Sequence, residues 1–326
     1  MAKKRAKSVK KAKRSVNKTV EAAPVIPVKK SNGGVIMAVV VLVIVALISI
    51  ESLMMIKQSA MMNKKPALVT SYKSFYRGIV CGVVYNNDYI TVGIDNNQVQ
   101  VQDKMTGQLK GFYTPVGASL LWAAESKDGT IYCMLKGTST LFKIKDFKKI
   151  GEVVLPEVKV MSGFCINSKD ELVAGDNTSA KIYRYSLDGV KLGEMAGFGS
   201  GNDKIQGGIG RVFTDAKDNI YVFTGNPCAV KVLTASGRFI TDIAFPKQDV
   251  CSMAQVAVAA DGNIYINDFS GSKIIVFSPG GKMIGKFDRD ISGNFQITFP
   301  PAISGGSDGN IYVCTHEIAV FKTIKY

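Results

Sequence analysis

Histidine is nearly absent from this chain of 326 residues, which contains His316 and no other. A zinc site built on two or three imidazoles is therefore excluded. A catalytic triad would need His316 itself as its base, because a serine or cysteine nucleophile depends on such a neighbour. Tryptophan is equally scarce, and Trp122 lies in the apolar run Leu120–Ala124, where a core position is expected.

Cysteine is present but shows no pattern of paired spacing. The six cysteines contain no C-x-x-C pair and are Cys81, Cys133, Cys165, Cys228, Cys251 and Cys314. This spacing argues against both a zinc site and a dense disulfide framework. Most of them fall in segments expected to form strands, where cysteine behaves as a small hydrophobic residue. An even number still permits disulfides if the domain is exported.

Acidic residues are almost missing from residues 1–32, which hold eleven Lys and Arg but only Glu21. This segment carries 11 − 1 = +10 of the chain's +15, which leaves +5 for all the rest. Its composition predicts a disordered tail. Such a tail can be read as a nucleic-acid-binding arm, but we favour a topology determinant that contacts anionic lipid. Since the rest of the chain has little excess charge, no nucleic acid partner is expected.

An apolar segment of about 20 residues occupies 33–56 and is long enough to span a bilayer. We predict a signal-anchor helix there. The anchor positions include Val35, Leu42, Ile44, Leu47 and Ile50. A cleaved signal peptide is the main alternative, which the long basic leader and the lack of a clear A-x-A site disfavour. A buried core helix would need a partner domain that the flanking sequence does not provide.

The distribution of basic residues predicts the orientation of this helix. Most of them precede it, so the positive-inside rule places the N-terminus in the cytoplasm and the remainder in the periplasm or outside the cell. Residues 57–66 are expected to form a short tether. The single glycosylation sequon Asn177-Thr178-Ser179 is near chance, which favours a bacterial inner membrane over a eukaryotic secretory route.

A short phrase recurs through the rest of the chain. Asp261-Gly262-Asn263-Ile264-Tyr265 returns at 308–312, with weaker copies ending at Tyr132, Val173 and Tyr221 and a degenerate one ending at Ile90. Successive copies are 42, 41, 48, 44 and 47 residues apart. A period in the forties, built on turns followed by alternating strands, is typical of propeller blades. A row of unrelated hairpins is the alternative.

Each copy predicts four short strands, but the last one ends without a fourth. The segment 67–75 precedes the first copy and alternates like a strand. We therefore expect it to pair with the last copy and close the ring, since neighbouring sheets must stack to bury their faces.

Two copies carry a resemblance to the NHL-repeat family of six-bladed β-propellers, namely Asp261 to Phe287 and Asp170 to Met195. The connector Phe198-Gly199-Ser200-Gly201 resembles that family's glycine-rich connector, whereas the copies near residues 78 and 118 depart from its pattern. The resemblance implies an all-β, six-bladed NHL-like propeller over 67–326, after one transmembrane helix and the basic tail. Some NHL-type rings are lyases with several metal-binding histidines, and this chain cannot build that site.

Propeller geometry points to one set of loops as a candidate site. The loops after each second strand share a face with the connections between blades. On this face lie Asp95, Asp176, Asp268, His316 and Glu317. We predict that they form part of a ligand- or partner-binding face. Two alternatives remain, namely that Asp176 and Asp268 bond their own loop backbone, or that the acids form a solvated rim.

These features favour a binding or scaffold module over an enzyme. The expected partners are the bilayer, through one helix, and a protein, peptide or glycan at the propeller face within an envelope complex, with no cofactor. The alternative is a calcium-dependent hydrolase of the lactonase type. Calcium takes oxygen ligands, which Asp95, Asp176, Asp268 and Glu317 would supply without histidine.

Overall fold

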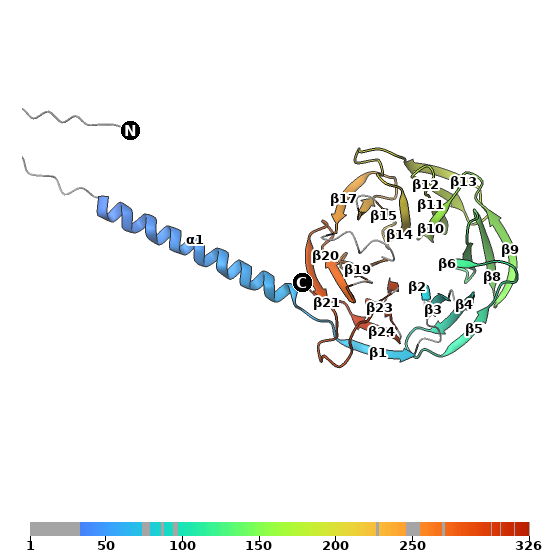
Figure 1. The fold of residues 1–326 in the computed structure, drawn as a ribbon, viewed down its shortest axis with the longest axis horizontal. Helices are drawn as coiled ribbons and strands as arrows, with labels where there is room; N and C mark the ends of the chain where they lie inside the picture. Colours follow the sequence, from blue (N-terminus) through green and yellow to red (C-terminus); the bar gives the residue numbers. More distant parts are fainter. Residues whose placement is uncertain are drawn as a thin grey trace, which may run out of the picture. The chain divides into compact units, whose positions relative to one another are not determined.

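The computed structural model describes residues 33–73, 79–85, 88–93, 97–225, 228–245, 255–268, 271–300, 302–306, 308–315 and 317–325. Within these ranges the chain forms one helix and 24 strands. The strands make six four-stranded antiparallel sheets that follow one another around a ring (Figure 1). The predicted six-bladed β-propeller is therefore confirmed.

Five sheets are formed by consecutive strands. The first is β2 (Ile79–Tyr85), β3 (Asp88–Gly93), β4 (Gln98–Asp103) and β5 (Leu109–Tyr113). The second is β6 (Leu120–Glu125), β7 (Ile131–Leu135), β8 (Thr140–Lys145) and β9 (Lys148–Val154). The third is β10 (Met161–Ile166), β11 (Glu171–Asp176), β12 (Lys181–Ser186) and β13 (Lys191–Ala196). The fourth is β14 (Ile209–Thr214), β15 (Ile220–Gly225), β16 (Cys228–Leu233) and β17 (Phe239–Ala244). The fifth is β18 (Val256–Val258), β19 (Ile264–Asp268), β20 (Lys273–Phe277) and β21 (Met283–Phe287).

The sixth sheet combines the two ends of the ring. Its strands are β22 (Ala302–Gly305), β23 (Asn310–Cys314), β24 (Glu317–Lys322) and β1 (Leu68–Lys73), in the order β1-β24-β23-β22. The register runs from Leu68 opposite Phe321 to Lys73 opposite Glu317. This is the pairing expected for the segment 67–75, and it joins the start of the ring to its end by main-chain hydrogen bonds.

The recurring phrase forms the turn between the first and second strands of a sheet. In five sheets the fourth turn residue donates its N–H to the carbonyl three positions earlier. That fourth residue has positive φ in each case: Gly129, Asp170, Asp218, Gly262 and Gly309. The last residue of each copy is a core side chain, with Tyr312 fully buried and Tyr265 only 1% exposed. The repeated residues therefore form turns and core positions rather than a catalytic or binding site.

The second sheet lacks the second glycine turn of its neighbours. Asp146 and Phe147 connect β8 to β9 instead, both with positive φ. A β-carbon on Gly111 of β5 would lie 2.4 Å from the Phe147 ring, so this aromatic ring lies directly over the glycine. The close approach between the first two sheets thus requires glycine at position 111, where any side chain would clash with the Phe147 ring.

The helix α1 extends from Gly33 to Met62. Its part Val39–Met62 is long and apolar enough to cross a membrane, and none of these residues is buried. Leu42 and Leu47 are 68% and 55% exposed, and Ile44 and Ile50 are exposed too, while the side chain of Val35 lies outside the described part.

The helix continues six residues beyond the predicted end at 56, so most of the expected tether 57–66 is helical. No helix breaker occurs until Pro66, which disfavours helical geometry at the residue before it. The basic tail 1–32 lies outside the described residues.

Candidate functional site

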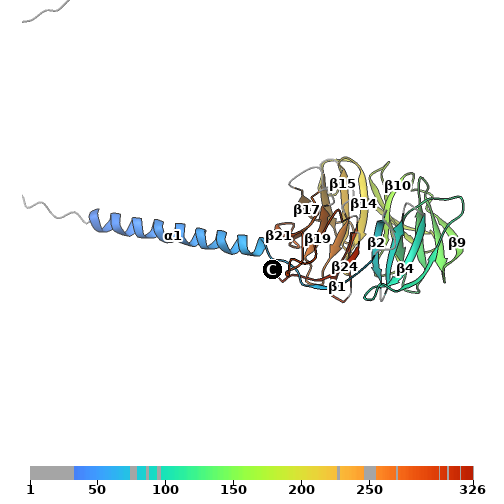
Figure 2. The same ribbon diagram turned by 60° about the horizontal axis from the view of Figure 1, so that its bottom comes forward.

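The antiparallel sheets give the ring two distinct faces (Figure 2). One face is formed by the loops between second and third strands and by the connectors between sheets, and we call it the loop face. We call the turn face the opposite one, formed by the turns between first and second strands and between third and fourth strands. The sequence predicts a binding site on the loop face.

Asp176, at the end of β11, is fully buried on the loop face. It accepts the Val160 N–H at 2.9 Å, the Thr178 N–H at 3.2 Å, and both the N–H and the hydroxyl of Ser179, the latter at 2.7 Å. Burial opposes ionisation, but these hydrogen bonds outweigh it and hold the pKa of Asp176 below its ordinary value. Its oxygens thus order the loop that follows β11 and the connector that enters β10.

Asp268 occupies the equivalent place in the fifth sheet and is 4% exposed. It accepts the Gly271 N–H at 2.8 Å and forms an ion pair with Lys273 at 2.8 Å. The carboxylate therefore orders the loop that follows β19. This geometry matches the alternative in which such acids bond their own loop backbone, as for Asp176.

Of the remaining candidates, the structure describes only Glu317. Glu317 begins β24, where its backbone N–H donates to the Thr315 hydroxyl at 3.0 Å, and it also lines a peripheral cavity beside β1. Asp95 and His316 lie outside the described residues. In the part of the chain that is described, no three His, Cys, Asp or Glu side chains are placed to hold a metal ion.

Amide side chains on the loop face fix the entry of the chain into each following sheet. Asn97 accepts the Leu120 N–H at 2.7 Å, and Asn177 accepts the Ile209 N–H at 3.1 Å. Asn267 donates to the carbonyl of Pro300 at 2.7 Å. Each of these three amides thus links one sheet to the next on the described part of the loop face.

Four connectors on the loop face expose apolar side chains. Val116 is 97% exposed, Val160 52%, Phe198 57% and Phe299 61%. Each lies in a different connection between consecutive sheets, so the set is distributed around this face. The sequence drew attention to Phe198 only as part of a glycine-rich connector, and it did not indicate the other three, because connector residues do not follow the repeat. A contiguous group of exposed apolar side chains marks a docking surface, whereas single exposed apolar side chains are common on any protein surface.

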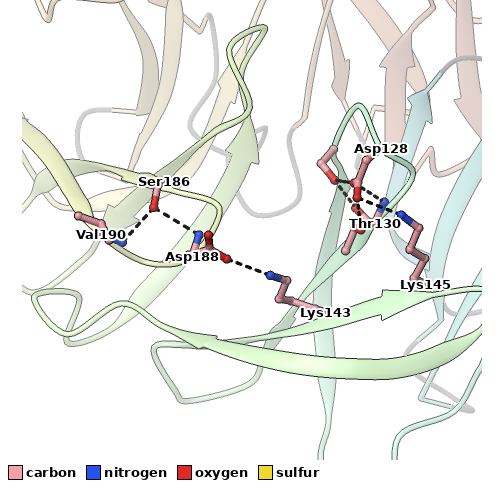
Figure 3. A network of polar contacts seen from close by, with 8 residues as sticks. Asp128, Thr130, Lys143, Lys145, Ser186, Asp188 and Val190 are labelled. Carbon is pink, nitrogen blue, oxygen red and sulfur yellow. Dashed lines mark hydrogen bonds and ion pairs between the residues drawn. The ribbon is translucent and has the colours of Figure 1, made fainter.

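Carboxylates on the turn face are mostly bound to their own turns. Asp128 accepts from the Ser126 hydroxyl at 2.7 Å, from Thr130 and from Lys145 at 3.0 Å, and these contacts hold its pKa below the ordinary value (Figure 3). In the same region Lys143 of β8 pairs with Asp188 of the third sheet at 3.2 Å. Such contacts connect neighbouring sheets and leave these acids little capacity for a ligand.

A cavity of about 820 Å³ lies where the innermost strands meet, and turn-face residues also line it. All six sheets contribute to its lining, through residues such as Gly82, Ala123, Phe164, Phe213 and Ile303. The sequence did not indicate this cavity, because the small and aromatic residues that line it belong to strands that are expected to pack in the core.

Trp122 forms part of the cavity wall and is 5% exposed. Its ring meets Phe213 edge-on at a centroid distance of 5.6 Å, and the Arg211 guanidinium lies 4.7 Å from its centroid. The burial of Trp122 confirms its predicted core role, and its side chain also lines the cavity. The ring already accepts one cation at its π system.

Of the described cysteines, Cys165 lines the cavity. Cys133 and Cys314 are buried free thiols, and Cys165 is a third free thiol. Burial raises the pKa of Cys165 to about 12, which makes it unreactive. Cys228 is disulfide-bonded, and its partner side chain lies outside the described part of the chain.

Solved structures that resemble the chain share its fold at low sequence identity. A streptogramin B lyase aligns with a TM-score of 0.56 and 13% identity, over 78% of this chain and 96% of that one. Catalytically inactive virginiamycin B lyase from Staphylococcus aureus with quinupristin gives 0.56 and 18%, over 78% and 84%. A protein of unknown function from Bacteroides caccae gives 0.52 and 14%, over 70% and 83%.

These likenesses show a six-bladed propeller and no particular activity, because one propeller fold supports many functions. No protein-family model and no curated protein matches the chain. The resemblance to the NHL-repeat family therefore stays a prediction, and the chain is described here by its architecture: a six-bladed β-propeller with one apolar N-terminal helix.

Proposed function

We propose that this protein is a membrane-tethered binding module whose loop face docks a protein partner outside the cytoplasm. The observation that carries the proposal is the set of exposed apolar side chains on four loop-face connectors: Val116, Val160, Phe198 and Phe299. Protein interfaces are built around apolar anchors of this kind on a preorganised surface.

The inward-directed polar groups of the loop face support docking over catalysis. Asp176 and Asp268 use their oxygens within their own loops, and the amides of Asn97 and Asn267 hold the connectors. A scaffold fixed in this way loses little conformational entropy when a partner binds.

The helix supplies the tether in this proposal. Val39–Met62 has the length and composition of a membrane span, and the basic residues that precede it favour an N-terminus in the cytoplasm. Holding the ring at a membrane raises its effective concentration toward partners in the same membrane.

Site-directed photo-crosslinking in cells tests the docking face. A photoreactive residue placed at Val116, Val160 or Phe198 should give a discrete crosslinked species of higher mass. Matched controls at the exposed turn-face residues Lys127 and Lys217 should give none. Equal crosslinking on both faces, or none at the three loop-face positions, would overturn the proposal.

A further inference from the structure

The central cavity lies apart from the docking face proposed above. It is lined by innermost strands of all six sheets and by turn-face residues including Lys127, Ser168, Ala216 and Ala260. Its volume of about 820 Å³ lies within the range of small-molecule pockets. A cavity of this size at the centre of the ring is large enough to enclose a small solute.

Four aromatic residues contribute to the wall of this cavity. Trp122, Phe164, Phe213 and Tyr221 all line it. Aromatic rings carry negative charge on their faces and attract organic cations, most of all quaternary ammonium groups. The Arg211 guanidinium already lies 4.7 Å from the Trp122 centroid, so the other aromatic rings of the wall are the ones open to a ligand cation.

Charged residues along the lining also favour a cation. Among the described residues there are four carboxylates to two ammonium groups. The acids are Glu125, Asp170, Asp215 and Asp261, and the bases are Lys127 and Lys217. Lys127, Lys217 and Asp261 are exposed, so their charges are better screened by solvent than those of the partly buried Glu125, Asp170 and Asp215.

Glu125 differs from the other three acids of the lining. Its Oε2 atom is buried and has no hydrogen-bond partner within the described residues. Burial, with the nearby charges of Asp88 and Asp128, raises the pKa of Glu125 to about 7, although Lys110 opposes the shift. Lys110 is itself ion-paired with Asp88, so it compensates Glu125 only in part.

We propose that the central cavity binds a small organic cation of the quaternary ammonium class, held by the aromatic wall and by the charge of Glu125. A quaternary ammonium needs no hydrogen-bond acceptor, so it suits a largely apolar wall that contains aromatic rings. A bound cation near Glu125 stabilises the ionised carboxylate. Ionisation of Glu125 should therefore strengthen cation binding, and cation binding should favour loss of the Glu125 proton. The same chemistry is presented by a free solute and by a lipid headgroup.

The single tryptophan makes the test direct. The full-length protein in a maltoside detergent is titrated with choline at pH 8 while Trp122 emission is recorded. The matched probe is 3,3-dimethylbutan-1-ol, which replaces the charged nitrogen of choline with carbon. Choline should give a saturable change and bind about tenfold more tightly than the alcohol. Equal binding of the two, or no saturable response to choline, would overturn the proposal.

Variants locate the response within the cavity. Glu125→Gln should weaken choline binding about threefold to tenfold at pH 8. The wild type should weaken as the pH falls from 8 to 6, because Glu125 takes up a proton, whereas the variant should not change. Ala260→Leu fills the mouth and should abolish the response, while Ser236→Leu on an outer turn should not. A response unaffected by Ala260→Leu would contradict the assignment.

A second probe distinguishes the two sources of this chemistry. Glycerophosphocholine stands in for a lipid headgroup, and choline stands for a free solute. Tighter binding of glycerophosphocholine would assign the site to headgroups, and tighter binding of choline would assign it to a solute. Saturable binding of either one, lost in Ala260→Leu, supports the cation site.

Discussion

The carboxylate of Asp218 joins two neighbouring sheets by accepting the Ser168 N–H at 2.7 Å and the Ser168 hydroxyl at 2.8 Å. Asp218 has a φ of 62°, at a turn position where Gly129, Gly262 and Gly309 occur in other sheets. Left-handed geometry costs an L-residue about 1 kcal/mol. The two hydrogen bonds between sheets offset this strain, which explains why glycine is absent at this position.

Replacing Asp218 by glycine should therefore destabilise the ring although it relieves strain. The loss of two hydrogen bonds to a carboxylate outweighs the gain, and we expect the free energy of unfolding to fall by about 1–2 kcal/mol. Asp170→Gly is the matched control, because Asp170 accepts a single bond, from the Lys127 N–H at 3.0 Å. Denaturant unfolding should show a smaller change for Asp170→Gly, and equal losses would refute the argument.

Ring closure through β1 should control the stability of the whole domain. We compare a truncated protein that begins at residue 63 with one that begins at residue 77. The second lacks β1, so β24 keeps β23 but loses its other antiparallel partner. It should lose the cooperative thermal transition, because an open ring exposes an unpaired edge and two uncovered faces. An unchanged Tm for the shorter protein would show that closure is dispensable.

The buried carboxyl of Glu125 should make stability depend on pH. Its folded pKa, about 7, lies above the unfolded value of 4.5, so the folded state binds the extra proton between these values. Stability should therefore fall as the pH rises from 4.5 to 7 and stay low above it. Glu125→Gln should remove this loss, with a gain of about 1–2 kcal/mol at pH 8 after solvent screening is allowed for. Denaturant unfolding at pH 4.5 and pH 8 measures the difference in stability between the wild type and Glu125→Gln, which should vanish at pH 4.5.

Asp176 distinguishes a structural acid from a calcium ligand. Asp176→Ala leaves the Val160 and Thr178 N–H groups without their acceptor and should lower stability by about 2–3 kcal/mol. The wild-type melting temperature should not change when calcium is added or chelated. A rise of several degrees with calcium, lost in Asp176→Ala, would instead support the hydrolase alternative.

The apolar helix should retain the protein in membranes. Full-length protein should resist alkaline extraction, whereas a protein that begins at residue 63 should be soluble. The mass of the mature protein tests the alternative of a cleaved signal peptide, since a signal anchor keeps its N-terminal residues. Recovery of a mature form that begins after residue 50 would exclude the anchor.

Local sequence was sufficient to predict the ring, because its turns and core positions recur every forty or so residues. The phrase ending at Tyr265 and Tyr312 marks a turn whose glycine has positive φ and a tyrosine that packs in the core. Both depend on short-range chemistry, which a single chain displays directly. The closing strand was predictable for a related reason, since one sheet was short of a strand and one segment was left over.

The functional surfaces could not be predicted in this way. Asp176 and Asp268 were singled out as acids on a shared face, but only the fold shows that their oxygens are directed into their own loops. Trp122 and Phe213 meet in the cavity wall because β6 and β14, which are distant in sequence, are both innermost strands of the ring. Contacts of this kind depend on how the whole ring closes, which no local pattern specifies.

The sequence by itself thus determined the repeat, the number of sheets and an apolar segment long enough to span a bilayer. The tertiary structure alone decided which polar groups are already bound, which apolar connectors are exposed, and where a cavity remains. The physical reason is that turns, strand periodicity and helix length are set by neighbouring residues. Burial and hydrogen-bond satisfaction are set by residues that only folding brings together.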